Sequence, residues 1–163
     1  TFQRMLSEEE TQGLLLLNGK LTGGQVVVSD PECGEVSISI EDSSSALRFT
    51  GTAENPRFEI SLQIEGEIGA ISGGQKHLAS DVFPRLEQAF SERISACVEA
   101  YLSATVYESG CDTAEFSGAV LRDAPDVWHL VSENRAEFLK RAVFDLHIEA
   151  RIARVEEEDT PYF

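Results

Sequence analysis

The chain has 163 residues, of which 42% are hydrophobic and 26% are charged. This length is enough for one domain that buries a core without disulfides or a metal ion. With 29 Asp plus Glu against 13 Lys plus Arg, the formal net charge is -16, which disfavours binding to nucleic acid or directly to an anionic membrane surface.

The first predicted element is a helix over residues 6–20. Ser7 can cap its N-terminus, Glu10 stands three residues later as in a capping box, and Gly19 can end it. We expect three leucines to face a core: Leu6, Leu14 and Leu17.

Strands are predicted next, at residues 25–30, 35–41 and 57–69. In the last two, apolar and polar residues alternate, which indicates one buried and one solvated face. A serine-rich turn from Ser43 to Ser45 is expected after the second strand, before a weaker continuation at Leu47 and Phe49. This pattern favours an antiparallel sheet that is covered on one side.

Two helices and a strand complete the prediction. Between Ser80 and Glu108, apolar residues recur at helical spacing, which predicts an amphipathic helix roughly 40 Å long. Ser80 or Asp81 can cap it. A second helix is predicted over residues 123–142, and an alternating strand follows over residues 143–155. The expected fold is a single α+β domain, with a mixed or antiparallel sheet of about four strands packed against one long and two shorter helices.

The segment ISGGQK, at residues 71–76, is one conservative change away from the Leu-Ser-Gly-Gly-Gln signature of ABC-type ATPases. Such an enzyme also needs a G-x-x-x-x-G-K-[ST] loop to hold phosphates, and the sequence contains none. His77 stands where the magnesium-binding hydroxyl would be required. We therefore interpret the glycines as a junction between a strand and a helix.

No residue pattern indicates catalysis, a cofactor or a metal. His77, His129 and His147 are predicted on a loop, a helix and a strand, without the spacing of metal ligands. An enzyme would need perturbed carboxylates in a cleft, for example Glu65 with Glu67, but these two residues are expected on the solvated face of one strand. We assign no catalytic, cofactor-binding or metal-binding residue.

The cysteines do not form a recognisable framework. Cys33, Cys97 and Cys111 show no C-x-x-C spacing, and their odd number argues against a disulfide framework and against a zinc site. A disulfide between Cys97 and Cys111 stays open, because the first lies on the predicted long helix and the second just after it.

Several motifs occur in a characteristic order. E-E-T-x-G-L-L opens the first helix at residues 9–15, and I-E-G-x-I ends a strand at residues 64–68. Asp112 follows the long helix, and a P-x-x-W stretch at residues 125–128 precedes Asn134 and Phe138. Together these segments resemble the C-terminal domain of the C subunit of Ger-type spore germinant receptors, although Arg135 replaces the family's second tryptophan.

The resemblance implies a non-enzymatic, lipid-anchored subunit on the outer face of the spore inner membrane. Its implied partners are the integral-membrane A and B subunits of a receptor that responds to nutrients. Residues 1–163 would form the C-terminal domain of a longer lipoprotein, and the lipidated cysteine would lie in an N-terminal part absent from this sequence, which opens TFQRML without an initiator Met.

Asp112, Phe116 and Trp128 are candidate partner contacts, because the region around them carries motif matches. Alternatively, these residues maintain the fold. A rival function is an extracytoplasmic sensor domain that binds a small ligand itself. Such a sensor predicts a concave apolar pocket with convergent polar groups, whereas a scaffold predicts a filled core and an exposed patch.

Overall fold

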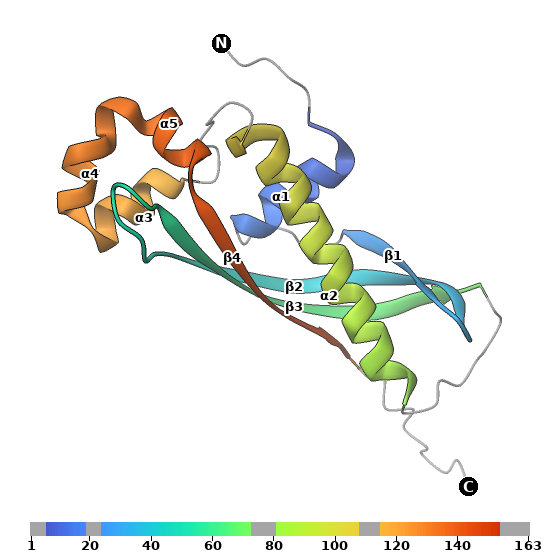
Figure 1. Ribbon diagram of the computed structural model, residues 1–163. Coiled ribbons are helices and arrows are strands. Elements are labelled where there is room, and N and C mark those ends of the chain that lie inside the picture. Colours follow the sequence, from blue (N-terminus) through green and yellow to red (C-terminus); the bar gives the residue numbers. More distant parts are fainter. Residues whose placement is uncertain (1–5, 19–23, 73–80, 108–114, 154–163) are drawn as a thin grey trace, which may run out of the picture.

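Four strands form a single curled sheet in the order β1-β2-β3-β4 (Figure 1). The computed structural model describes residues 6–18, 24–72, 81–107 and 115–153. β1 (Gln25–Asp30), β2 (Gly34–Phe49) and β3 (Arg57–Ile71) are antiparallel neighbours. β4 (Val143–Ile152) pairs with β3 in parallel. The expected α+β class with a mixed sheet is confirmed.

β2 is one continuous strand, so the predicted turn from Ser43 to Ser45 is wrong. The register of β2 against β3 shifts between Ile40 and Asp42. Before this bulge the even-numbered residues are buried, and after it the inward positions are odd-numbered, as at Ser43 and Phe49. A bulge adds one residue to one strand and breaks its two-residue period, which made this stretch resemble a turn.

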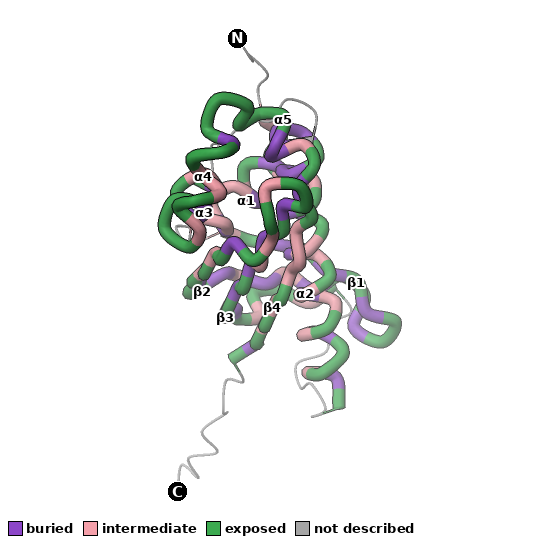
Figure 2. Tube along the Cα trace, turned by 60° about the vertical axis from the view of Figure 1, so that its left-hand side comes forward, coloured by how far each residue is buried: buried purple, intermediate pink, exposed green. Residues whose placement is uncertain are grey.

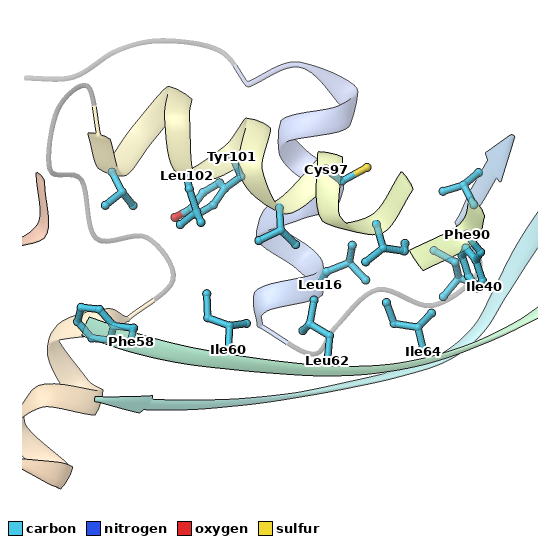
Figure 3. Packing of buried hydrophobic residues seen from close by; sticks show 14 of the residues in the cluster. Leu16, Ile40, Phe58, Ile60, Leu62, Ile64, Phe90, Cys97, Tyr101 and Leu102 are labelled. Atoms are coloured by element: carbon cyan, nitrogen blue, oxygen red, sulfur yellow. The ribbon is translucent and has the colours of Figure 1, made fainter. Parts of the chain in front are cut away.

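The apolar face of the sheet is covered by α2 (Val82–Tyr101), which continues as the π-helical segment η1 (Leu102–Tyr107). The expected long helix is thus confirmed, although its last segment is wound differently. Asp81 precedes α2 but makes no side-chain capping hydrogen bond, contrary to expectation, and Ser80 lies outside the described residues. Figure 3 shows how α2 and the sheet interdigitate through buried side chains that include Ile40, Ile60, Leu62, Ile64, Phe90 and Tyr101.

α1 (Glu8–Leu17) lies against α2 (Figures 1 and 3). The predicted capping box is confirmed: Ser7 Oγ accepts a hydrogen bond from the Glu10 N–H at 3.1 Å, and the Glu10 carboxylate accepts one from the Ser7 N–H at 3.1 Å. A Cβ at Gly13 would lie 2.2 Å from the Cys97 carbonyl oxygen, so only glycine permits this close approach.

The buried leucine of α1 is Leu16, which the sequence analysis missed. Leu6, Leu14 and Leu17 pack against the core as expected, but they are only partly buried. The contact with α2 selects the face of α1 that carries Gly13 and Leu16, which are three residues apart and therefore neighbours on a helix surface.

A lobe of short helices lies at one end of the sheet (Figure 1). It comprises α3 (Phe116–Asp123), α4 (Pro125–Val131), the 3-10 segment η2 (Ser132–Asn134) and α5 (Arg135–Lys140). The single helix predicted over residues 123–142 is therefore wrong, and α3 was missed. Ala124, with φ of -148° and ψ of 70°, separates α3 from α4, and Pro125 then begins α4 at a position where proline is well tolerated.

One end of the sheet is held by an ion pair between the buried Asp30 and the partly exposed Arg85, which we call the turn clamp. The Asp30 carboxylate, with 3% of its side chain exposed, lies 3.1 Å from Arg85 Nε and accepts hydrogen bonds from the N–H groups of Glu32 at 2.9 Å and Cys33 at 3.0 Å. The hydrogen bond from Arg85 holds the pKa of Asp30 well below its usual range. The clamp joins the turn between β1 and β2 to the first turns of α2.

The other end is held by a second pair, the lobe clamp, made by Asp123 and Arg122. The Asp123 carboxylate accepts hydrogen bonds from Arg122 Nε at 2.9 Å and from the Phe49 N–H at 3.0 Å, and Arg122 also donates to the Leu47 carbonyl. The Arg122 guanidinium, followed by the Phe49 N–H, lowers the pKa of Asp123 to about 2. This clamp joins α3 to the outer edge of β2.

Candidate partner-contact surface

The three candidate contact residues have different environments. Phe116 is fully buried: its ring centroid lies 5.3 Å from that of Phe58 and 4.9 Å from that of Phe144. It begins α3 and anchors the lobe on β3 and β4, so it supports a surface without forming it. Asp112 lies outside the described residues.

Trp128 lies on α4, half-buried, and packs against the core cluster. Two leucines of the same lobe are exposed, Leu130 of α4 at 74% and Leu121 of α3 at 51%. Figure 2 shows that exposed positions dominate the outer part of this lobe. Leu121, Trp128 and Leu130 are called the lobe surface below.

Sequence analysis did not single out Leu121 or Leu130. The sequence offers one signal for the exposure of Leu130. In a continuous helix, this residue lies outside the apolar stripe formed by residues 127, 128, 131 and 138. Recognising an exposed leucine requires knowing which face of α4 the core covers. Large exposed apolar side chains that share one region commonly indicate an interaction surface.

Two hollows lie on the polar face of the sheet, between β3 and β4. Their volumes are about 280 Å³ and about 530 Å³, and polar side chains dominate both linings. Gln63 and Glu149 border both hollows, while Arg151 borders the smaller and His147 the larger. These open depressions differ from the apolar pocket that the sensor hypothesis predicts.

The remaining polar candidates do not gather into one site. Glu65 and Glu67 are exposed on the polar face of β3, and His129 and His147 are exposed on α4 and β4. His77 lies outside the described residues. Within the described ranges, no three His, Cys, Asp or Glu residues are grouped as a metal site requires.

The cysteines that can be placed are buried. Burial raises the pKa of both the Cys33 and Cys97 thiols, and a buried neutral thiol is a poor nucleophile. Cys97 carries no disulfide, and its Sγ lies 3.6 Å from Gln12 Oε1. Cys111 lies outside the described residues. In the part of the chain that the structure describes, none of the helices is both long and apolar enough to cross a bilayer.

Comparisons with known proteins agree with this architecture. A search of curated proteins gives no match. The solved structure titled "Crystal Structure of the GerBC protein" shares the fold, with a TM-score of 0.79 and 22% sequence identity over 90% of this chain. The aligned part is 46% of that solved chain, so this chain corresponds to about half of its length. The family model described as "Spore germination B3/ GerAC like, C-terminal" matches residues 1–156, and the chain therefore belongs to this family of spore germination domains.

Proposed function

We propose that this chain is a non-enzymatic domain of the C subunit of a nutrient germinant receptor. The whole protein would be held by an N-terminal lipid anchor on the outer face of the spore inner membrane. There it would work with the integral-membrane A and B subunits. The observation that carries this proposal is the family match, which extends over residues 1–156.

The structure supports a scaffold in two respects. The core between α2 and the sheet is filled by large side chains, of which Tyr101, Phe58 and Phe90 have essentially no exposed area. The lobe surface presents Leu121, Trp128 and Leu130 at one end of the molecule. We propose that an extracytoplasmic segment of the A or B subunit covers this surface.

The first experiment removes the gene from the spore former that carries it. Spores are then tested against a panel of nutrients and against a trigger that bypasses nutrient receptors. We expect loss of the response to one group of nutrients, an unchanged response to the bypass trigger, and restoration by the full-length gene. Normal germination with every nutrient, in a strain without other receptor genes, would refute the proposal.

A second experiment tests the lobe surface with Leu130→Asp in the full-length protein. Leu130 is 74% exposed, so the substitution should leave the fold intact while placing a charge in the contact. We expect reduced co-purification with the membrane subunits and slower nutrient germination. The matched control is Val27→Asp on β1, at a residue that is 53% exposed and lies outside the lobe. Equal effects of both variants would argue against the lobe surface.

The alternative is that the domain itself senses a small ligand. The hollows at β3 and β4 give this alternative little support, because polar side chains dominate their linings. Thermal denaturation of the purified chain with each active nutrient tests the alternative directly. A saturable rise in melting temperature with one nutrient would favour the sensor over the scaffold.

A further inference from the structure

β4 forms an edge of the sheet, and its backbone polar groups alternate between two directions. The N–H of Val143 donates to the Pro56 carbonyl at 3.0 Å, and the N–H of Ala153 donates to the Gly66 carbonyl at 2.8 Å. Odd-numbered residues of β4 therefore bond to β3. Since backbone groups alternate along a strand, the even-numbered residues direct their N–H and C=O groups away from β3.

One outward group is already satisfied within the chain. The Ile152 N–H donates to Glu87 Oε2 of α2 at 3.0 Å, which confirms the outward direction of the even-numbered residues. Leu146, Ile148 and Ala150 occupy the same outward positions in the middle of β4. Their side chains point to the core side but are only half-buried, because among the described residues no fifth strand lies beyond β4.

The middle of this edge lacks three common forms of protection against strand pairing. Natural edges are commonly blocked by proline, lysine or a bulge. The ten residues of β4, VFDLHIEARI, contain neither proline nor lysine, and their register with β3 is unbroken. By contrast, the far part of the β2 edge is covered by the lobe clamp, which binds the Leu47 carbonyl and the Phe49 N–H.

We propose that β4 pairs with β4 of a second copy of this chain, antiparallel and centred on Ile148. Two-fold symmetry places Ile148 opposite itself and Leu146 opposite Ala150 of the second copy. These positions carry the outward backbone groups, and each such pair exchanges two hydrogen bonds. The two sheets then form one continuous sheet, in which the half-buried side chains of β4 cover one another.

The charges on the polar face of β4 fit this register. Asp145 lies opposite Arg151 of the second copy, and His147 lies opposite Glu149 of the second copy. By symmetry each contact occurs twice, and the opposite charges of Asp145 and Arg151 directly across the strand pair are favourable. Within one chain Arg57 lies 3.4 Å from Asp145, and Arg151 lies 2.5 Å from Glu149, so the pairing would extend existing ion pairs into a network.

The neighbouring symmetric registers are disfavoured by the same charges. Centring the pair on His147 places Asp145 opposite Glu149 of the second copy. Centring it on Glu149 places the two Glu149 side chains opposite each other. Like charges directly across a strand pair are destabilising, so the sequence of β4 selects the register centred on Ile148.

The test is analytical ultracentrifugation of the 163-residue chain from about 1 µM to about 1 mM, at near-physiological salt, with charge-swap variants. Arg151→Asp and Asp145→Arg each create two like-charge contacts, and we expect each to raise the dimer dissociation constant about tenfold or more. The double variant restores opposite charges, so its dissociation constant should return towards that of the wild type. Arg48→Asp is the control, because it changes the net charge by the same amount as Arg151→Asp. Arg48 lies on the same face of the sheet but on β2, with 72% of its side chain exposed.

A wild-type chain that stays monomeric at the highest concentration would overturn the proposal. So would a double variant that dimerises no better than the single variants, or an Arg48→Asp effect equal to that of Arg151→Asp. Amide hydrogen exchange gives a second measurement. The N–H groups of Leu146, Ile148 and Ala150 should gain protection as the concentration rises, whereas that of His147 should be protected throughout. Concentration-dependent protection elsewhere on the chain, without any at these three residues, would also overturn the proposal.

Discussion

The turn clamp and the lobe clamp use the same chemistry in different surroundings. In each, an aspartate binds an arginine guanidinium and accepts backbone N–H groups, two at Asp30 and one at Asp123. Asp30 keeps 3% of its side chain exposed, whereas Asp123 keeps 26%. Asp30 and its arginine, Arg85, are 55 positions apart in the sequence. Asp123 and Arg122 are sequence neighbours, and the distant partner of Asp123 is the backbone N–H of Phe49.

This difference indicates what each clamp contributes. Loss of the buried Asp30 carboxylate removes the acceptor of the N–H of Cys33, a buried residue, so the turn clamp is part of the folded core. The lobe clamp lies in contact with water, and its groups can be solvated when the contact opens. The lobe can therefore separate locally from β2 at a lower free-energy cost than the turn between β1 and β2 can separate from α2.

The largest expected effect is that of Asp30→Ala. It removes the acceptor for the Cys33 N–H, which is buried, and leaves Arg85 without its principal partner. We expect a loss of about 2–4 kcal/mol in the free energy of unfolding. Urea denaturation followed by circular dichroism measures this loss. An unchanged midpoint would contradict the role assigned to the turn clamp.

Asp123→Ala should destabilise the chain clearly less, because the groups that it releases are in contact with water. Its effect should be local. Hydrogen exchange should accelerate at the Phe49 N–H and along α3, while the amides of β3 stay protected. If exchange accelerated equally over the whole sheet, the lobe would not be an independently opening unit.

The smallest expected effect is a difference in acid sensitivity. In the folded chain the pKa of Asp123 is lowered from 3.8 to about 2, so its contribution to stability is complete above about pH 5 and falls as the pH drops through 2. The pKa of Asp30 is lowered further, so its contribution also begins to fall near pH 5 but keeps most of its slope at pH 2.

The stability difference between wild type and Asp123→Asn should therefore be constant from pH 7 to about pH 5, decrease between pH 5 and pH 2, and level off only below pH 2. At pH 2 the difference between wild type and Asp30→Asn should be decreasing more steeply, because the pKa of Asp30 is lowered further. Urea midpoints measured across this range check both curves. Identical curves for the two variants would remove the distinction between the clamps.

The spacing of apolar residues along the sequence predicted those parts of the fold in which burial follows a regular repeat. The alternation along β3 and the spacing of Leu86, Phe90 and Ile94 on α2 correspond to the faces that are buried. The bulge after Ile40 could not be predicted, because it depends on the register with β3 rather than on any property of β2 alone. The burial of Leu16 likewise depends on the close approach of α1 to α2 at Gly13.

The candidate surface was only partly accessible from the sequence. Motif matches indicated Phe116 and Trp128, but the burial of Phe116 against Phe58 and Phe144 depends on the parallel placement of β4. The exposure of Leu130 depends on which face of α4 the core covers. Both are consequences of how distant segments meet.

The parallel pairing of β3 with β4 has a consequence for the order in which the chain folds. Arg57 pairs with Val143, so the two paired strands are separated by 143 − 57 = 86 positions along the chain. β1, β2 and β3 are joined by short connections and can form hairpins early. β4 can pair with β3 only after α2 and the lobe have been synthesised. Because closing so long a loop is slow, β3 is exposed along one edge during this interval, and a chaperone that acts on this protein should bind it there.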